Sequence, residues 1–262
     1  MPPTAASIRK HLRAAADPAR VPVLQRFFRT GKGEYAEGDQ FIGVTVPRIR
    51  AICRECRGAS VTEIERLLQS PVHEDRLAAL LLLVDAFTRA RGRDSEGRDS
   101  DDRKREIYEL YLANTHRINN WDLVDSSAPQ IVGAWLRDRS KAPLTRLAKS
   151  AMLWERRIAM IATQDFIRQG QFDETFRIAD LLIGDPHDLI HKATGWMLRE
   201  AGKRDEAALR SYLDRQHARM PRTMLRYAIE RLPERDRLAY LERPGRQSRQ
   251  GRQGAAEAVA AK

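Results

Sequence analysis

The chain has 262 residues, of which 42% are hydrophobic, so it is long enough and apolar enough to bury a substantial core. Lys and Arg number 47 against 36 Asp and Glu, and the resulting net charge of +11 favours a polyanionic partner such as nucleic acid or an acidic membrane surface. The sequence holds no apolar run of the roughly 18 residues that a membrane span requires, and two cysteines are too few for a disulfide framework.

The N-terminal region shows no targeting signal. Residues 1–20 contain Ala, Ser and Arg but no apolar stretch of the kind that a secretory signal needs, and Asp17-Pro18 predicts a turn before a helix. Together with the absence of a membrane span, these features predict a soluble, cytoplasmic protein that makes no membrane contact.

The hydrophobic pattern predicts short helices throughout. Apolar residues recur at spacings of three and four, as in Ile64, Leu67 and Leu68, whereas β-branched runs are short. Proline marks turns or helix starts between these segments, at Pro18, Pro47, Pro71, Pro143, Pro186 and Pro221. Cys53 and Cys56 have C-x-x-C spacing but lie inside a helical pattern without a second ligand pair, so we expect two reduced cysteines.

A repeat becomes visible when the predicted helices are aligned. A basic residue closely followed by a small one opens an apolar helix at Arg76, Arg157, Lys192 and Arg226, and the helix near Trp121 fills the wide first gap. Units of roughly 35 to 40 residues are typical of HEAT-like helix pairs. We therefore predict an all-α, curved solenoid over residues 1–243, with binding on its concave face.

Two charged segments lie outside this repeat. Residues 89–105 have dense mixed charge and no apolar anchor, which predicts an exposed or disordered loop between repeats. The tail at 244–262 is rich in Gln, Arg, Gly and then Ala, and we expect it to be disordered as well.

The most informative segment is the predicted helix at 118–135. Trp121 and Asp125 are four residues apart and project from one face. Later repeats add partners at corresponding places: Trp154 with Arg157, and Lys192 with Trp196 and Arg199. If these helices line the inner wall, an acid, aromatic rings and cations converge on one groove. Each residue also has a plain structural interpretation: a tryptophan packs in the core, Asp125 pairs with an inter-repeat arginine or caps a helix, and the arginines are solvated.

Four segments resemble successive landmarks of the AlkD-type DNA alkylation repair family. They are RFFRTGKGEYAEGDQFIGVTVPRIR at 26–50, NNWDLVDSSAP at 119–129, LWERRIAMIAT at 153–163 and IHKATGWMLREAGK at 190–203. They occur in the family's order and cover nearly the whole chain except the charged loop and the tail. The resemblance implies a HEAT-like repeat DNA glycosylase whose catalytic residues match Trp121, Asp125, Arg157 and Trp196. In this site we expect Arg157 to hold a backbone phosphate of the DNA.

The same resemblance implies double-stranded DNA with cationic N3- or N7-alkylated purines as the substrate, acted on without a tight base pocket. Phe27 stands where some members have a tyrosine near the DNA, and Asn120 stands where an aromatic residue also occurs. We expect a monofunctional, monomeric enzyme that needs no cofactor and no metal. The DNA contacts that we expect are Lys192, Arg199, Arg156, Arg76, Arg226 and Phe27.

Two other functions fit parts of the sequence. His187 and His191 are four apart, as in zinc hydrolases, but Asp188 replaces the usual glutamate and no third ligand is evident. Helical repeat proteins also act as protein scaffolds or as DNA-binding modules without catalysis. The retained set of Trp121, Asp125, Arg157 and Trp196 favours the enzyme.

Overall fold

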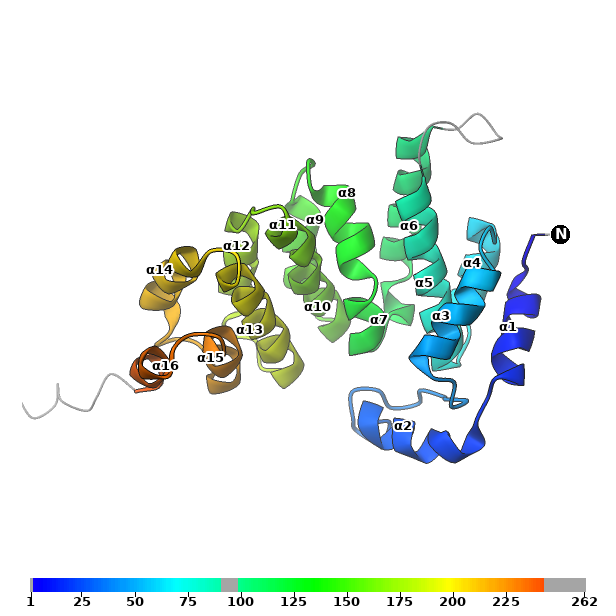
Figure 1. Cartoon of the computed structure of the whole chain (residues 1–262), viewed down its shortest axis with the longest axis horizontal. Coiled ribbons are helices and arrows are strands. Elements are labelled where there is room, and N and C mark those ends of the chain that lie inside the picture. The colour runs from blue at the N-terminus through cyan, green and yellow to red at the C-terminus, as the bar shows by residue number, and fades with distance from the viewer. Residues whose placement is uncertain (1, 91–98, 243–262) are drawn as a thin grey trace, which may run out of the picture.

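Helices form a single curved row. The computed structural model describes residues 2–90 and 99–242. Within these ranges the chain is helical and forms no strand, apart from one isolated bridge between Gln40 and Val72, so the prediction of an all-α solenoid is confirmed. Figure 1 shows the helices side by side from α1 at one end to α16 at the other, with α2 crossing the lower edge of the row.

The first part of the row contains the long α5. Its elements are α1 (Ala5–Ala14), η1 (Pro18–Arg20), α2 (Val21–Phe28), α3 (Val46–Glu55), α4 (Val61–Leu68), α5 (His73–Arg89) and α6 (Ser100–Ala113). The middle contains η2 (Thr115–Arg117), α7 (Trp121–Asp125), the π-helical turn η3 (Pro129–Gly133), α8 (Ala134–Leu136), α9 (Ala142–Ala148), α10 (Leu153–Ala162) and α11 (Gln164–Arg168). The last part contains α12 (Asp173–Leu182), α13 (Asp188–Gly202), α14 (Glu206–Gln216), α15 (Arg222–Ile229) and α16 (Glu234–Leu241).

Local sequence explains where these helices begin. The side chains of Ser60 and Asp205 accept hydrogen bonds from backbone amides in the first turns of α4 and α14. Pro47 and Pro143 occupy the first turns of α3 and α9, where a missing N–H leaves no helical hydrogen bond unmade. Asp99 caps α6 in the same way, so residues 99–105 are not the loop that we predicted; residues 91–98 lie outside the described ranges, as does the tail.

The predicted helix at 118–135 is interrupted. Asn120 caps α7, which ends at Asp125, and the π-helical turn η3 precedes α8. Pro129 stands four residues after Asp125, so it cannot donate the helical hydrogen bond to that residue's carbonyl, and its ring disfavours a continuous helix there. The helix therefore ends directly behind the candidate carboxylate.

Two glycines let neighbouring helices approach closely. A Cβ atom added at Gly133 would lie 2.2 Å from the carbonyl oxygen of Ala162 in α10. One added at Gly195 in α13 would lie 2.4 Å from the carbonyl oxygen of Met224 in α15. Both positions require glycine because only a missing side chain leaves room for the adjacent backbone.

The segment between α2 and α3 is fastened to α5 by a buried carboxylate. Glu74 accepts hydrogen bonds from the backbone amides of Ile42, Gly43 and Val44, at 3.1, 2.8 and 3.3 Å to its Oε1 atom. A buried carboxylate is tolerated when several N–H groups replace its hydration. This contact holds the segment that carries Tyr35 and Asp39 against the row.

We expect Gly195→Ala to lower the free energy of unfolding by about 1–3 kcal/mol, because the added methyl group must push α13 and α15 apart. Urea denaturation measures the effect. Gly184→Ala is the matched control, since no atom lies within 4 Å of its added Cβ. Equal unfolding midpoints for the two variants would contradict the close approach.

Candidate active site

The candidate carboxylate is fixed by an arginine from a neighbouring helix. Arg157 of α10 donates from Nε to Asp125 Oδ1 at 2.9 Å and from Nη2 to Asp125 Oδ2 at 2.7 Å. Its Nη1 atom donates to the carbonyl oxygen of Leu189 at 2.7 Å. The Arg157 side chain is 6% exposed and that of Asp125 is 17% exposed. The pair that we considered as the structural interpretation of Asp125 is therefore present.

Burial and pairing act on Asp125 in opposite directions. Burial raises the pKa of Asp125, and the Arg157 guanidinium opposes that rise through its charge and its hydrogen bonds. A carboxylate accepts a bidentate guanidinium most strongly when it is ionised, because both oxygens then carry negative charge. The geometry thus presents an oriented anion with part of its surface still open.

A cavity of about 580 Å³ lies beside this pair. Its lining side chains come from α2 and the segment after it, from α7, α10, α13 and α15, and from the turn before α13: Phe27, Arg29, Tyr35, Trp121, Arg157, His187, Asp188, Leu189, Lys192, Trp196, Arg199 and Tyr227. Asp125 is not among the lining residues; it meets the cavity wall through Arg157. Five of the predicted site residues besides Arg157 are brought together here, namely Trp121, Trp196, Lys192, Arg199 and Phe27.

The three tryptophans considered from the sequence lie in two environments, the cavity wall and the core. The ring of Trp121 stacks on Phe28 with centroids 5.3 Å apart and meets the edge of Phe27 at 5.7 Å. Trp196 stands on α13, where its Nε1 atom donates to Glu200 at 3.2 Å. Trp154 is buried in the core and contacts Tyr35 edge-on. Its plain structural interpretation is correct, whereas Trp121 and Trp196 are only half-buried and face the cavity.

Cationic side chains surround the cavity. Lys192 pairs with Asp188 at 2.7 Å, and Arg199 pairs with Glu230. Arg29 is exposed, and its backbone has the left-handed φ of 53°. A non-glycine residue in this region is uncommon and is held there by its surroundings, here the end of α2.

Two of the predicted DNA contacts, Arg76 and Arg156, are engaged by internal partners. Arg76 is 3% exposed, pairs with Asp39 and donates to the carbonyl oxygens of Ser70 and Pro71, so it has no free surface for a phosphate. Arg156 makes the corresponding contacts, to two carbonyl oxygens of the preceding turn and to Asp185 at 2.6 Å.

Arg76 is therefore the repeat counterpart of Arg156. The predicted alignment of the repeats, which paired Arg76 with Arg157, was shifted by one residue. Arg226 is exposed on α15 but does not line the cavity.

The residues considered for zinc chemistry have structural partners. His187 Nδ1 accepts from the amide of Leu189 at 3.1 Å, and His191 Nε2 contacts the carbonyl oxygen of Asp185 at 2.5 Å. Among the residues in the described ranges, no group of three or more His, Cys, Asp or Glu side chains is placed to hold a metal ion. Cys53 and Cys56 are unpaired and buried, and burial raises the pKa of Cys53 to about 12.

Arg29, Tyr35 and Tyr227 are among the lining residues that the sequence reasoning missed. Arg29 and Tyr35 lie in the segment after α2, and Tyr227 lies on α15. Tyr35 and Arg29 are within the 26–50 segment that carried the resemblance, so that segment contained the signal. Nothing in their spacing indicated that an irregular segment would reach the cavity.

No helix in the part of the chain that is described is long and apolar enough to cross a membrane.

Comparison with known proteins agrees with this architecture. The family model described as "DNA alkylation repair enzyme" matches residues 8–232. A solved structure, titled a predicted DNA alkylation repair enzyme from Enterococcus faecalis, superimposes with a TM-score of 0.62 at 16% identity, over 84% of this chain and 97% of that one. That likeness concerns the fold alone, and no curated protein matches the sequence. Because the family model spans most of the chain, the protein belongs to the DNA alkylation repair enzyme family.

Proposed function

We propose that the protein is a monofunctional DNA glycosylase that hydrolyses the N-glycosidic bond of cationic N3- and N7-alkylated purines in duplex DNA. The observation that carries this proposal is the Asp125 carboxylate, oriented by Arg157 beside a basic cavity in which Trp121 and Trp196 present their rings. Membership of an alkylation repair family supplies the class of substrate.

The chemistry requires stabilisation of the sugar more than of the base. An N3- or N7-alkylated purine carries positive charge and leaves as a neutral base, so it needs little help from a general acid. The deoxyribose becomes oxocarbenium-like as the bond breaks, and a fixed carboxylate lowers the barrier electrostatically. Asp125 is the candidate for this role and for positioning the attacking water.

The aromatic rings suit the same charge. The faces of Trp121 and Trp196 attract a nearby cation through the ring quadrupole. An ammonium or guanidinium in place of a ring would repel the developing charge on the sugar. We assign both tryptophans to contacts with the deoxyribose, and we assign selectivity to the charge of the leaving group.

Arg157 takes a different role from the one we first expected. Three of its N–H groups are committed to Asp125 and to the Leu189 carbonyl, so it orients the catalytic carboxylate instead of holding a phosphate. Phosphate contacts fall instead to Arg29, Lys192 and Arg199, which line the cavity with cationic side chains.

Lyase chemistry has little support in this site. It requires an amine with a free lone pair to attack the sugar carbon. Lys192 is the lysine that lines the cavity, and its Nζ atom is ion-paired with Asp188 at 2.7 Å. We therefore propose hydrolysis without a covalent protein–DNA intermediate, and borohydride trapping of such an adduct would show otherwise.

We expect Asp125→Asn to slow base release by a hundredfold to a thousandfold, on the order of a single preorganised electrostatic group, while duplex affinity stays unchanged. The measurement is single-turnover release of 7-methylguanine or 3-methyladenine, beside a binding titration and a thermal melt. Asp138→Asn, at an exposed carboxylate on the other side of η3, is the matched control. A folded Asp125→Asn protein that binds and excises at the parental rate would refute the catalytic role of Asp125, whereas a parent protein that binds duplex but releases no base would be a binding module.

The raised pKa of Asp125 predicts an acid limb in the excision rate. Below that pKa the carboxyl group is neutral and cannot stabilise the sugar cation, so the rate falls at a pH above the ordinary aspartate value of about 3.9. Arg157→Lys weakens the opposing bidentate contact and should move the limb to higher pH. Rates between about pH 4 and 8, corrected for spontaneous depurination, test this. Arg168→Lys on α11 is the control and should keep the parental limb. A limb at the same pH in the parent and in Arg157→Lys would mean that a group other than Asp125 titrates.

Arg29→Ala and Lys192→Ala should each weaken binding to undamaged duplex and reduce the slope of log affinity against log salt by about 1. Each removes one cation that the cavity presents to a phosphate. Fluorescence anisotropy across a salt series gives the slopes. Arg168→Ala, whose side chain bonds Gln164 away from the cavity, is expected to leave the slope unchanged. Parental slopes in all three variants would place the DNA elsewhere.

A further inference from the structure

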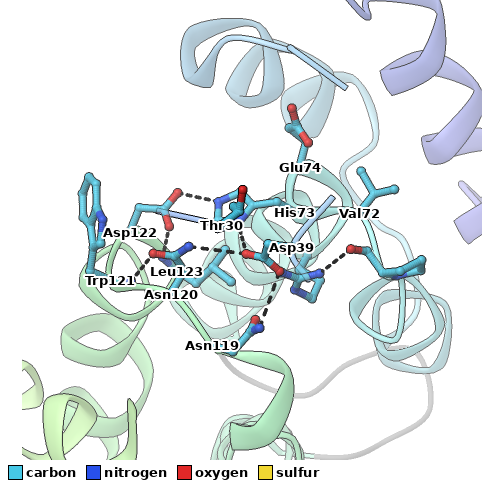
Figure 2. Close-up of polar contacts among 12 residues, drawn as sticks. Thr30, Asp39, Val72, His73, Glu74, Asn119, Asn120, Trp121, Asp122 and Leu123 are labelled. Carbon is cyan, nitrogen blue, oxygen red and sulfur yellow. Dashed lines mark hydrogen bonds and ion pairs between the residues drawn. The ribbon is translucent and has the colours of Figure 1, made fainter. Parts of the chain in front are cut away.

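A buried histidine lies behind the candidate site. His73 is the first residue of α5 and is 2% exposed. Its Nδ1 atom is 3.1 Å from Asp39 Oδ2, and its Nε2 atom is 2.8 Å from Asp122 Oδ2. Figure 2 shows the imidazole between these two carboxylates, which come from the segment before α3 and from α7.

The geometry requires a protonated ring. A neutral imidazole has one N–H group, so it can donate to only one of two carboxylates, whereas an imidazolium donates to both. Burial lowers the pKa of His73, but Asp122 and Asp39 raise it by more, to about 9. Burial raises the pKa of Asp39, but His73 and Arg76 together bring it below its usual range, so this carboxyl group is an anion.

Further cations lie around the His73 contacts. Arg76, from the same helix, pairs with Asp39, and the charge of Arg117 in η2 acts on both Arg76 and Asp39. Asn119 and Asn120 donate amide hydrogens to Asp39 at 3.5 and 3.4 Å. Loss of the His73 proton would remove the positive charge between Asp39 and Asp122 and one of the two hydrogen bonds that the ring donates to these carboxylates.

Polar and aromatic contacts connect His73 to the site. Asp122 belongs to α7, whose first residue is Trp121 and whose last is Asp125. The His73 ring also lies 4.9 Å from the ring of Phe28, which stacks on Trp121. Helix α7 has only five residues, too few to be stable by its own hydrogen bonds, so outside contacts must fix its position.

We propose that His73 is a positioning residue: as an imidazolium between Asp39 and Asp122, it fixes the helix that carries Trp121 and Asp125. The inference rests on the proposed glycosylase function. A buried ion cluster is expensive to desolvate, and apolar packing would hold a helix with less cost. An imidazolium gives two things that apolar packing does not. Its N–H group fixes the direction of the Asp122 side chain, and its positive charge offsets the negative charge of Asp122 near Asp125.

The test couples titration of His73 to catalysis. In the parent protein, NMR of labelled histidine follows the His73 ring between about pH 7 and 10, and single-turnover release of 7-methylguanine is measured over the same range with spontaneous loss subtracted. We expect the excision rate to fall with the same midpoint as the ring titrates, near the pKa of about 9. Duplex affinity should change little across this transition, because His73 does not line the cavity.

A substitution gives the second readout. His73→Gln keeps a donor for only one carboxylate, and we expect it to slow release by about tenfold to a hundredfold at neutral pH and to abolish the alkaline fall, since small displacements of reacting groups cost rates of this order. His116→Gln, at an exposed histidine of η2, is the matched control and should keep the parental profile.

The outcomes separate the two proposals. A parental rate that stays level while His73 loses its proton would overturn the positioning role, as would a folded His73→Gln protein with the parental rate and profile. If His73→Gln fails to fold, the titration of the parent protein decides alone. If the parent releases no alkylated purine at any pH, the glycosylase proposal fails and the positioning role fails with it.

Discussion

The bidentate ion pair between Asp125 and Arg157 is the contact on which the candidate site depends. It joins α7 to α10 and engages two of the five N–H groups of Arg157, while a third donates to the Leu189 carbonyl. Removing either partner would leave an unpaired charge in a largely buried place, which costs far more than the pair contributes. The pair therefore fixes where the carboxylate points, and the cavity is arranged around that direction.

Two features of the fold bring the other walls of the cavity beside the Asp125–Arg157 pair. Along the row, Gly133 and Gly195 let successive helices approach until backbone nearly touches backbone, which brings the face of α13 with Lys192 and Trp196 beside α10 and α15. Across the row, the segment after α2 carries Arg29 and Tyr35 to the same cavity, anchored by backbone hydrogen bonds to Glu74. One site is thus built from a periodic scaffold and an irregular arm.

Sequence reasoning succeeded where one physical rule dominates. Helix periodicity predicts the fold class because each helix must bury an apolar stripe. The Arg76 register was wrong because a single-residue offset between repeats cannot be seen in spacings alone. Arg29, Tyr35 and the Asp39–His73 contact were missed because they join an irregular segment to a helix far along the chain, and no local pattern encodes such pairing. The break after Asp125 was signalled by Pro129 and could have been predicted.

An anion already paired with a cation can still act on a developing positive charge. Each carboxylate oxygen accepts along two lone-pair directions, and Arg157 occupies one direction on each oxygen of Asp125, which leaves one on each for a water or for the sugar. Because the guanidinium offsets part of the negative charge, the stabilisation that remains is smaller than that of an isolated carboxylate in the same place. Such a site suits bonds that are already weakened by a cationic base, since a neutral purine would need both a stronger anion and a proton donor. On this argument, the same contact that orients Asp125 also restricts the proposed reaction to charged lesions.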